Sequence, residues 1–214
     1  MSDTATPQYL LSIMFLRAFF RVFNRSEVTG RGHVPKSGGV LLIANHTSYV
    51  DPPIIGAVSP RPVHFMAKAQ LLKIPLLGGW MSQSHTFPVR RGTPDRAALR
   101  HAIELLRDGK VLLVFPEGSR SPDGRLQPFE DGAAFIALSA RARVVPAGII
   151  GARRVLPLDS PVLRPAKLRV QFGPALDLSE MHERKLTRDM LEHASRRMEQ
   201  ALRAALPPEL HPAP

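Results

Sequence analysis

The 214-residue sequence predicts one α/β domain, with a mixed and mostly parallel sheet that is flanked by helices. Short apolar runs alternate with segments of helical periodicity, a pattern typical of α/β domains. The chain is also long enough for one substantial core and too short for two complete domains. We therefore expect a single domain over residues 29–206, an N-terminal helix within residues 1–28 and a disordered tail over residues 207–214.

Apolar runs mark the expected strands. The clearest is Val40–Ala44, which follows Ser37-Gly38-Gly39 and contains no polar residue, as is typical of a strand buried on both faces. The other expected strands are residues 63–66, 86–89, 111–115, 144–150 and 168–172. The run 144–150 contains Pro146, which predicts an edge strand or a special strand, because proline has no amide proton to donate.

Helical periodicity marks the segments between these runs. Residues 95–107 place apolar side chains on one face, and residues 132–140 form a compact apolar helix. A last long helix is expected to begin near Thr187 as its N-cap and to end before Pro207-Pro208. Proline cannot continue a helix, so we expect the remaining residues to fray.

An apolar segment at residues 10–23 is interrupted by Arg17 and Arg21, and it is too short to span a bilayer. It also lacks the pattern of a secretory signal. On a helix, Arg17, Arg21 and Arg25 lie one turn apart and form a narrow cationic stripe. Such a helix either packs on the protein's own core or lies in a membrane interface. We expect the second arrangement, with the arginines toward anionic headgroups at the cytoplasmic face, as a peripheral or monotopic protein.

The formal net charge of +11 and the pI of about 11.1 favour polyanionic partners: nucleic acid, anionic lipid or phosphorylated small molecules. No nucleic-acid partner is expected, because only 6% of the residues are aromatic and no basic stripe with interleaved aromatic residues is present. The sequence contains no cysteine, which excludes a disulfide, a thiol nucleophile and a cysteine metal site. We expect no bound metal and no cofactor.

The first polar motif, Asn45-His46-Thr47-Ser48 with Asp51 further on, follows the Val40–Ala44 strand. Ligand sites of parallel sheets lie beyond the carboxyl ends of the strands. An imidazole can take a proton from an alcohol there, and a carboxylate on its other nitrogen fixes the tautomer. The pairing requires His46 to lie in the turn before a helix. In the alternative interpretation, Asp51 caps a helix and His46 is an ordinary residue at a strand end.

The second polar motif follows the run 111–115 and reads Phe115-Pro116-Glu117-Gly118-Ser119-Arg120-Ser121. Its hydroxyl and guanidinium groups are suited to grip a phosphate, while Glu117 is suited to orient a basic residue or a hydroxyl. It matches neither the elbow of serine hydrolases nor a phosphate-binding loop. Alternatively, it is a polar turn that caps the next helix. Arg90 and Arg91, which follow the run 86–89, are either solvated surface or part of a site.

Taken in order, these blocks and Val145-Pro146 resemble the four signature blocks of the glycerolipid acyltransferase family, whose best known members are 1-acylglycerol-3-phosphate O-acyltransferases. The resemblance covers about residues 30–155. Ser119 stands where the family usually has threonine, and it keeps the hydroxyl. An acidic Glu130-Asp131 stands where the family tends to have a lysine.

The resemblance implies transfer of a fatty acyl group from acyl-CoA or acyl carrier protein to the sn-2 hydroxyl of a lysophospholipid, 1-acylglycerol 3-phosphate. Another acceptor remains open, such as glycerol 3-phosphate, a different lysophospholipid or a lyso-ornithine lipid. It implies His46 as the base, Asp51 as its partner, and Asn45 and Ser48 as oxyanion or supporting residues. The implied phosphate pocket consists of Arg91, Arg90, Glu117, Gly118, Ser119 and Arg120. Val145 and Pro146 are implied to line the acyl pocket or to be structural.

Overall fold

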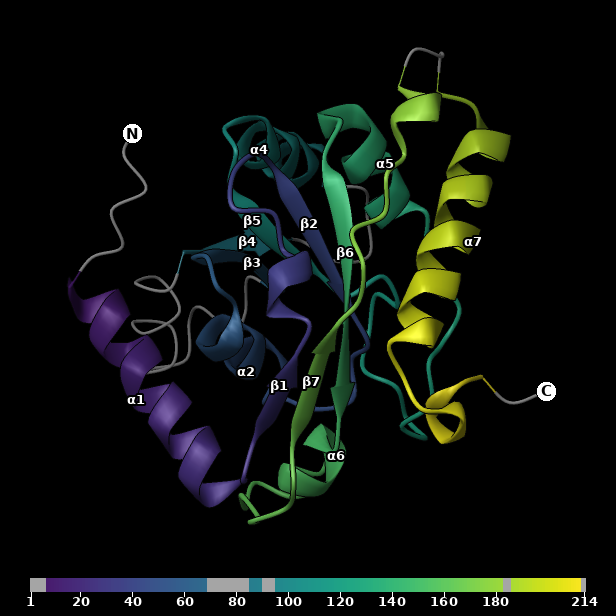
Figure 1. Ribbon diagram of the computed structural model, residues 1–214. Helices are drawn as coiled ribbons and strands as arrows, with labels where there is room; N and C mark the ends of the chain where they lie inside the picture. Colours follow the sequence, from purple (N-terminus) through teal and green to yellow (C-terminus); the bar gives the residue numbers. More distant parts are fainter. Residues whose placement is uncertain (1–6, 69–84, 90–94, 183–185, 213–214) are drawn as a thin grey trace.

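The computed structural model describes residues 7–68, 85–89, 95–182 and 186–212. These residues form a seven-stranded sheet in the order β1-β7-β6-β2-β5-β3-β4, with helices on both faces (Figure 1). Neighbouring strands are parallel except β6 and β7, so the predicted mixed, mostly parallel sheet is confirmed. The strands are β1 Glu27–Thr29, β2 Val40–Ala44, β3 Val63–Lys68, β4 Thr86–Val89, β5 Val111–Val114, β6 Arg143–Ile150 and β7 Arg169–Phe172.

Two helices begin at side-chain caps that the sequence encodes. The Asp95 side chain accepts a hydrogen bond from the amide of Ala98, and the Thr187 side chain accepts one from the amide of Met190. The predicted N-cap of the last helix is therefore confirmed. The α-helices are α1 Pro7–Phe23, α2 Asp51–Val58, α4 Arg96–Arg107, α5 Gly132–Ala140, α6 Ala152–Val155 and α7 Arg188–Ala204, and the 3₁₀ helices are η1 Arg31–His33, η3 Ser179–Met181 and η4 Pro208–Leu210.

Strand β2 lies near the middle of the sheet and is buried on both faces. Leu42 and Ala44 pack into the core that α1, α2 and α6 cover, whereas Leu41 and Ile43 pack into the core beneath α4, α5 and α7. The two helical layers lie on opposite sides of the sheet in Figure 1. Because both faces are shielded from solvent, every residue of the strand is apolar. The carboxyl end of this buried strand is a rigid support for the residues that follow.

Strand β6 is an interior strand, so the edge position that Pro146 suggested is wrong. The Pro146 carbonyl accepts a hydrogen bond from the amide of Gly173. The nitrogen and the carbonyl of one strand residue point to the same side, so the Pro146 nitrogen faces β7 and not β2. The register there shifts by one residue between the pair Ala147–Phe172 and the bridge Val144–Leu176. The proline thus occupies a local irregularity of the ladder, the special-strand alternative.

Both expected domain boundaries differ from the structure. β1 begins at Glu27, so the sheet includes residues that the sequence assigned to the N-terminal helical segment. At the other end, residues 207–212 are not a frayed tail. The amide of Leu126 donates to the Leu210 carbonyl, and the His211 Nε2 atom lies 3.0 Å from the Arg203 carbonyl oxygen. Proline stops α7, but the chain then turns back onto the domain in η4.

Helix α1 packs one side on α2, where Tyr9 and Phe20 are buried. The Arg17 side chain is exposed, and its Nε atom donates to the Ala57 carbonyl near the end of α2, so one residue of the expected cationic stripe also contacts the protein. The orientation of the stripe toward headgroups stays a prediction. The opposite side carries exposed apolar side chains, which we call the α1 ridge: Leu10, Leu11, Met14, Phe15, Val22 and Phe23. Within the described ranges, no helix has the length and apolar character needed to cross a bilayer.

Candidate active site

The turn between β2 and α2 places His46 beside Asp51. Asp51 opens α2, and its buried Oδ2 atom lies 2.8 Å from the His46 Nδ1 atom. The same oxygen accepts hydrogen bonds from the amides of Thr47 and Ser48, each at 2.7 Å. The carboxylate therefore closes the turn and orients the imidazole. His46 lies before the helix, as the pairing required, and the N-cap position belongs to Val50 and not to Asp51.

The imidazole of His46 is held between protein and solvent. Its face stacks on the Phe115 ring, with centroids 3.9 Å apart, and 13% of its side chain is exposed. A carboxylate beside Nδ1 favours the tautomer in which that nitrogen carries the proton and Nε2 carries the lone pair. Nε2 makes no hydrogen bond with any residue that the structure describes. His46 thus presents an unoccupied basic nitrogen at the carboxyl edge of the sheet.

Asn45 and Ser48 tie this turn to the rest of the fold. The Asn45 side chain donates to the Ile149 carbonyl at 2.9 Å and accepts from the Ile149 amide at 2.7 Å. The Ser48 hydroxyl donates to the Leu156 carbonyl at 2.7 Å. Both side chains are buried, so the structure gives them a supporting use, which fixes the turn against β6 and the segment after α6.

The loop of residues 115–121 follows β5, which lies next to β2, so the two polar motifs meet at one sheet edge. Glu117 holds the main chain of His46: its Oε1 atom accepts the His46 amide at 2.6 Å, and Oε2 accepts the Gln127 amide at 2.9 Å. The Ser121 amide donates to the His46 carbonyl at 2.7 Å. Glu117 is therefore a buried main-chain clamp behind His46, and its carboxylate does not face solvent.

Burial raises the pKa of Glu117 to about 7, because desolvation penalises the charged carboxylate. Hydrogen bonds from the amides of Gln127 and His46 partly offset this rise in pKa, and the negative charge of Asp51 adds to it. The ionised form accepts both amide hydrogen bonds, whereas protonation of one oxygen turns it into a donor. The hydrogen bond between the Glu117 carboxylate and the His46 amide is therefore sensitive to pH near neutrality.

This pKa predicts how stability depends on pH. Between pH 4.5, the ordinary pKa, and about pH 7, folded Glu117 keeps a proton that the unfolded chain releases. The folded state then binds more protons, so the unfolding free energy should fall as pH rises across this window. The expected loss is on the order of 3 kcal/mol relative to Glu117→Gln, which cannot ionise. Urea unfolding of both proteins across the window measures it, with Asp189→Asn as a surface control. Parallel pH profiles for wild type and Glu117→Gln would contradict this expectation.

The tip of the same loop carries the other predicted residues. Gly118 has a φ of 68°, a left-handed conformation that favours glycine, and the Glu130 carboxylate lies where a Cβ atom would be. Ser119 is exposed. The Arg120 guanidinium lies over the Tyr49 ring, 3.7 Å from its centroid, and its buried Nη1 atom has no hydrogen-bond partner among the described residues. An unpaired buried guanidinium nitrogen is suited to an anionic ligand.

The remaining predicted residues lie elsewhere. Arg90 and Arg91 fall outside the described residues. Val145 and Pro146 are buried in β6 beside the end of β2, as structural neighbours of the site. Sequence reasoning did not identify Tyr49, which supports Arg120, or Gln127, which shares Glu117 with His46. Tyr49 lies inside the first polar motif, and an aromatic ring close to a predicted cation was the available signal.

The described residues thus form an α/β fold in which a buried carboxylate orients an imidazole with one free nitrogen, an arrangement suited to general-base chemistry. The family model for acyltransferases matches residues 25–150. The chain belongs to this acyltransferase family, and its α/β fold agrees with the fold that the sequence predicted.

Relatives with known names agree with this assignment. The 1-acyl-sn-glycerol-3-phosphate acyltransferase of Bacillus subtilis is 30% identical over 140 residues, which cover 65% of this chain and 66% of that protein. The chloroplastic BAT2 protein of Brassica napus, which carries the same enzyme name, is 31% identical, and the match covers 64% of this chain and 41% of that protein. The crystal structure of the LPA acyltransferase PlsC from Thermotoga maritima has a TM-score of 0.75 and 28% identity, with 92% of this chain and 78% of that chain covered.

Proposed function

We propose that this protein is an acyltransferase that moves a fatty acyl group from acyl-CoA or acyl carrier protein to the sn-2 hydroxyl of 1-acylglycerol 3-phosphate. The product is phosphatidic acid, an intermediate of phospholipid biosynthesis. The observation that carries the proposal is the His46–Asp51 pair, with Nδ1 on the carboxylate and Nε2 free. The names of the relatives support the acceptor, and the thioester is a co-substrate, so no bound cofactor is required.

The reaction needs one proton transfer in each direction. Nε2 of His46 takes the hydroxyl proton while that oxygen attacks the thioester carbonyl, and Asp51 stabilises the imidazolium that forms. The tetrahedral intermediate then collapses and the C–S bond breaks. The departing thiolate takes the proton from His46, which restores the free base. No acyl-enzyme forms in this scheme.

The acceptor phosphate is proposed to bind Arg120 and Ser119, with Gly118 allowing the loop its turn and Arg90 and Arg91 completing the pocket. The unpaired Nη1 atom of Arg120 supports this role. Glu117 contributes indirectly, because it clamps the main chain of His46.

Replacing Arg120 by alanine is expected to raise KM for a phosphate-bearing acceptor by about 10- to 100-fold, because a charged hydrogen bond to the phosphate is lost. KM for the acyl donor should change little. Steady-state kinetics with each substrate varied in turn measure both constants, with Arg125→Ala as a control that removes a charge from the same loop region. An acceptor KM equal to that of wild type would exclude Arg120 from the phosphate pocket.

The function itself is tested by following thioester consumption with purified protein across a panel of acceptors. The panel contains 1-acylglycerol 3-phosphate, glycerol 3-phosphate, lysophosphatidylcholine and lyso-ornithine lipid, and His46→Ala serves as the blank. We expect the highest kcat/KM with 1-acylglycerol 3-phosphate. A higher value with another acceptor would replace the proposed substrate, and no thioester consumption with any of them would refute acyl transfer.

The α1 ridge supports a place for the protein at the cytoplasmic face of a membrane, as a peripheral or monotopic protein. Leu11 and Phe15 are each 69% exposed and one helical turn apart. The variant Leu11→Gln/Phe15→Gln is expected to keep its fold and to bind vesicles at least about 10-fold more weakly, because two large apolar side chains no longer leave water. Co-sedimentation with liposomes measures this, and unchanged binding would remove α1 as an anchor.

A further inference from the structure

The segment between α6 and β7 carries an apolar tip that the proposed chemistry does not use. Val162 is 62% exposed and Leu163 is 41% exposed. Two hydrogen bonds fix the conformation of this tip. The amide of Val162 donates to the Ser160 hydroxyl, and the amide of Arg164 donates to the Val155 carbonyl. A fixed loop thus presents two neighbouring apolar side chains to solvent, where their exposure is unfavourable.

Hydrogen bonds place this loop against the end of α1. The Asn24 side chain donates to the carbonyls of Arg164 and Ala166, at 3.0 and 3.1 Å. Asn24 directly follows Val22 and Phe23, the last residues of the α1 ridge. In Figure 1 the end of α1 and the segment around α6 lie at the same lower end of the molecule. The loop therefore lies beside the end of α1, next to the residues at which the ridge ends.

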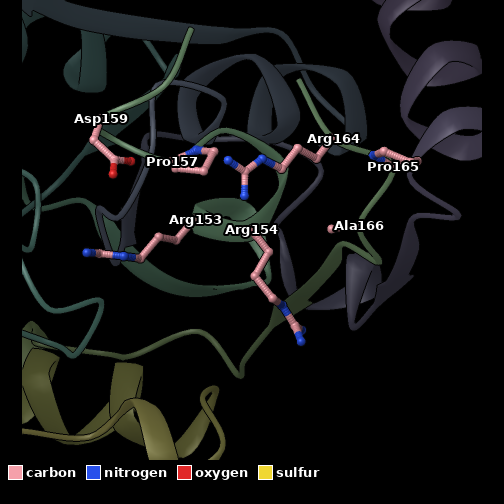
Figure 2. A pocket seen from close by; sticks show the side chains of 7 residues that line it. All are labelled: Arg153, Arg154, Pro157, Asp159, Arg164, Pro165 and Ala166. Atoms are coloured by element: carbon pink, nitrogen blue, oxygen red, sulfur yellow. The ribbon is translucent and has the colours of Figure 1, made fainter. Parts of the chain in front are cut away.

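Behind the tip lies a cationic pocket with a volume of about 610 Å³. Figure 2 shows Arg164 reaching toward Pro157, while Arg153 and Arg154 leave α6 in different directions. The guanidinium groups of Arg154 and Arg164 form no ion pair with any residue that the structure describes, and Asp159 is the only acidic residue among those lining the pocket. The lining residues are Arg153, Arg154, Pro157, Asp159, Arg164, Pro165 and Ala166.

The same loop is joined to the candidate active site. Its first residue, Leu156, accepts the hydrogen bond of Ser48 from the His46 turn. The Arg153 Nη1 atom donates to the Ser121 carbonyl, and the Ser121 amide donates to the His46 carbonyl. The loop is therefore fixed to the turn that carries His46.

We infer that α6 and residues 156–166 form a second membrane contact, in which Val162 and Leu163 enter the interface and the arginine pocket holds the phosphate of an anionic phospholipid. This inference rests on the proposed membrane association and extends it. Cationic side chains at the level of the lipid phosphates, with apolar side chains beside them, are the arrangement that an anionic bilayer surface requires. Contacts by the α1 ridge and the loop together fix the orientation of the domain and turn His46 toward the bilayer, where the acceptor lies.

The test compares two pairs of arginines by co-sedimentation of the full chain with vesicles. Arg154→Gln/Arg164→Gln removes two of the three positive charges that line the pocket and leaves Arg153 bonded to the Ser121 carbonyl. Arg188→Gln/Arg196→Gln removes the same charge from α7, where both arginines are exposed and pair with Glu192. With vesicles of phosphatidylcholine and phosphatidylglycerol, the pocket variant should bind about 30-fold more weakly than wild type and the α7 variant within about 3-fold of it. With phosphatidylcholine alone, the two variants should bind alike.

A third variant, Val162→Ser/Leu163→Ser, should bind both kinds of vesicle more weakly, by about 10-fold. If the α1 ridge variant loses binding while the pocket and tip variants bind like wild type, the second contact is wrong and the α1 anchor stands. If the pocket variant binds vesicles normally but has a raised KM for acyl-CoA, the arginines serve the donor, which also overturns the inference. Thioester consumption with acceptor in detergent micelles should be unchanged in the pocket and tip variants, so failure here is distinct from failure of the proposed reaction.

Discussion

Replacing His46 by alanine is expected to lower kcat by about 10²- to 10⁴-fold, the usual contribution of a general base. The loss arises because the substitution removes the Nε2 atom that is proposed to take the hydroxyl proton. The fold should persist, because the His46 contacts with Glu117 and Ser121 are made by its main chain, which the substitution keeps. Single-turnover measurements of thioester consumption give the rate of the chemical step, and circular dichroism monitors the fold.

The matched control is His193→Ala, an exposed histidine on α7. It removes the same side chain from a different surface and should retain the wild-type rate. A purified His46→Ala protein with close to wild-type kcat would show that another group takes the proton from the acceptor. The proposed mechanism would then lose its base, although the family assignment would stand.

Local signals predicted much of this fold correctly. The bounds of β2 follow from the sequence because a strand with two buried faces must be apolar at every position, and Val40–Ala44 is bounded by glycine and asparagine. The start of α7 follows from Thr187, whose side chain satisfies a free amide of the first turn. Such features depend on residues a few positions apart, which a sequence displays directly.

Features that depend on distant partners were missed. β1 has only three residues, and it exists because β7, far along the chain, offers it a parallel edge. Pro146 fits in an interior strand because Gly173 leaves room for its ring, since a Cβ on that glycine would come within 2.8 Å of the proline Cγ atom. The exposed Arg17 side chain bonds to the protein because the last turn of α2 presents the Ala57 carbonyl to its Nε atom. None of these partners is visible in the local pattern.

The site divides in the same way. His46 and Asp51 are five residues apart, so their pairing needs only one turn, and the motif revealed it. The clamp by Glu117 joins residues 71 positions apart in the sequence, and only the adjacency of β2 and β5 brings them together. The motif suggested that Glu117 orients a basic residue or a hydroxyl, and the resemblance placed it in the phosphate pocket, whereas the fold makes it a buried support of the His46 main chain.

Asp51→Asn is expected to lower kcat by about 10²- to 10⁴-fold with little change in either KM, as in other imidazole–carboxylate pairs. Asparagine is nearly isosteric, and its oxygen can still accept the amides of Thr47 and Ser48, so the turn should remain closed. What disappears is the negative charge beside Nδ1, which stabilises the imidazolium in the transition state.

The measurement must separate this loss of charge from a loss of structure. Nitrogen-15 spectra of the His46 ring report which nitrogen carries the proton, and urea unfolding reports stability. If Asp51→Asn keeps the proton on Nδ1 and still loses turnover, the carboxylate acts by charge. If the proton moves to Nε2, the carboxylate acts by fixing the tautomer, because a protonated Nε2 cannot accept the hydroxyl proton. A kcat within about 3-fold of wild type would contradict both roles of Asp51, stabilisation by charge and fixing of the tautomer. Loss of either role should raise the activation barrier.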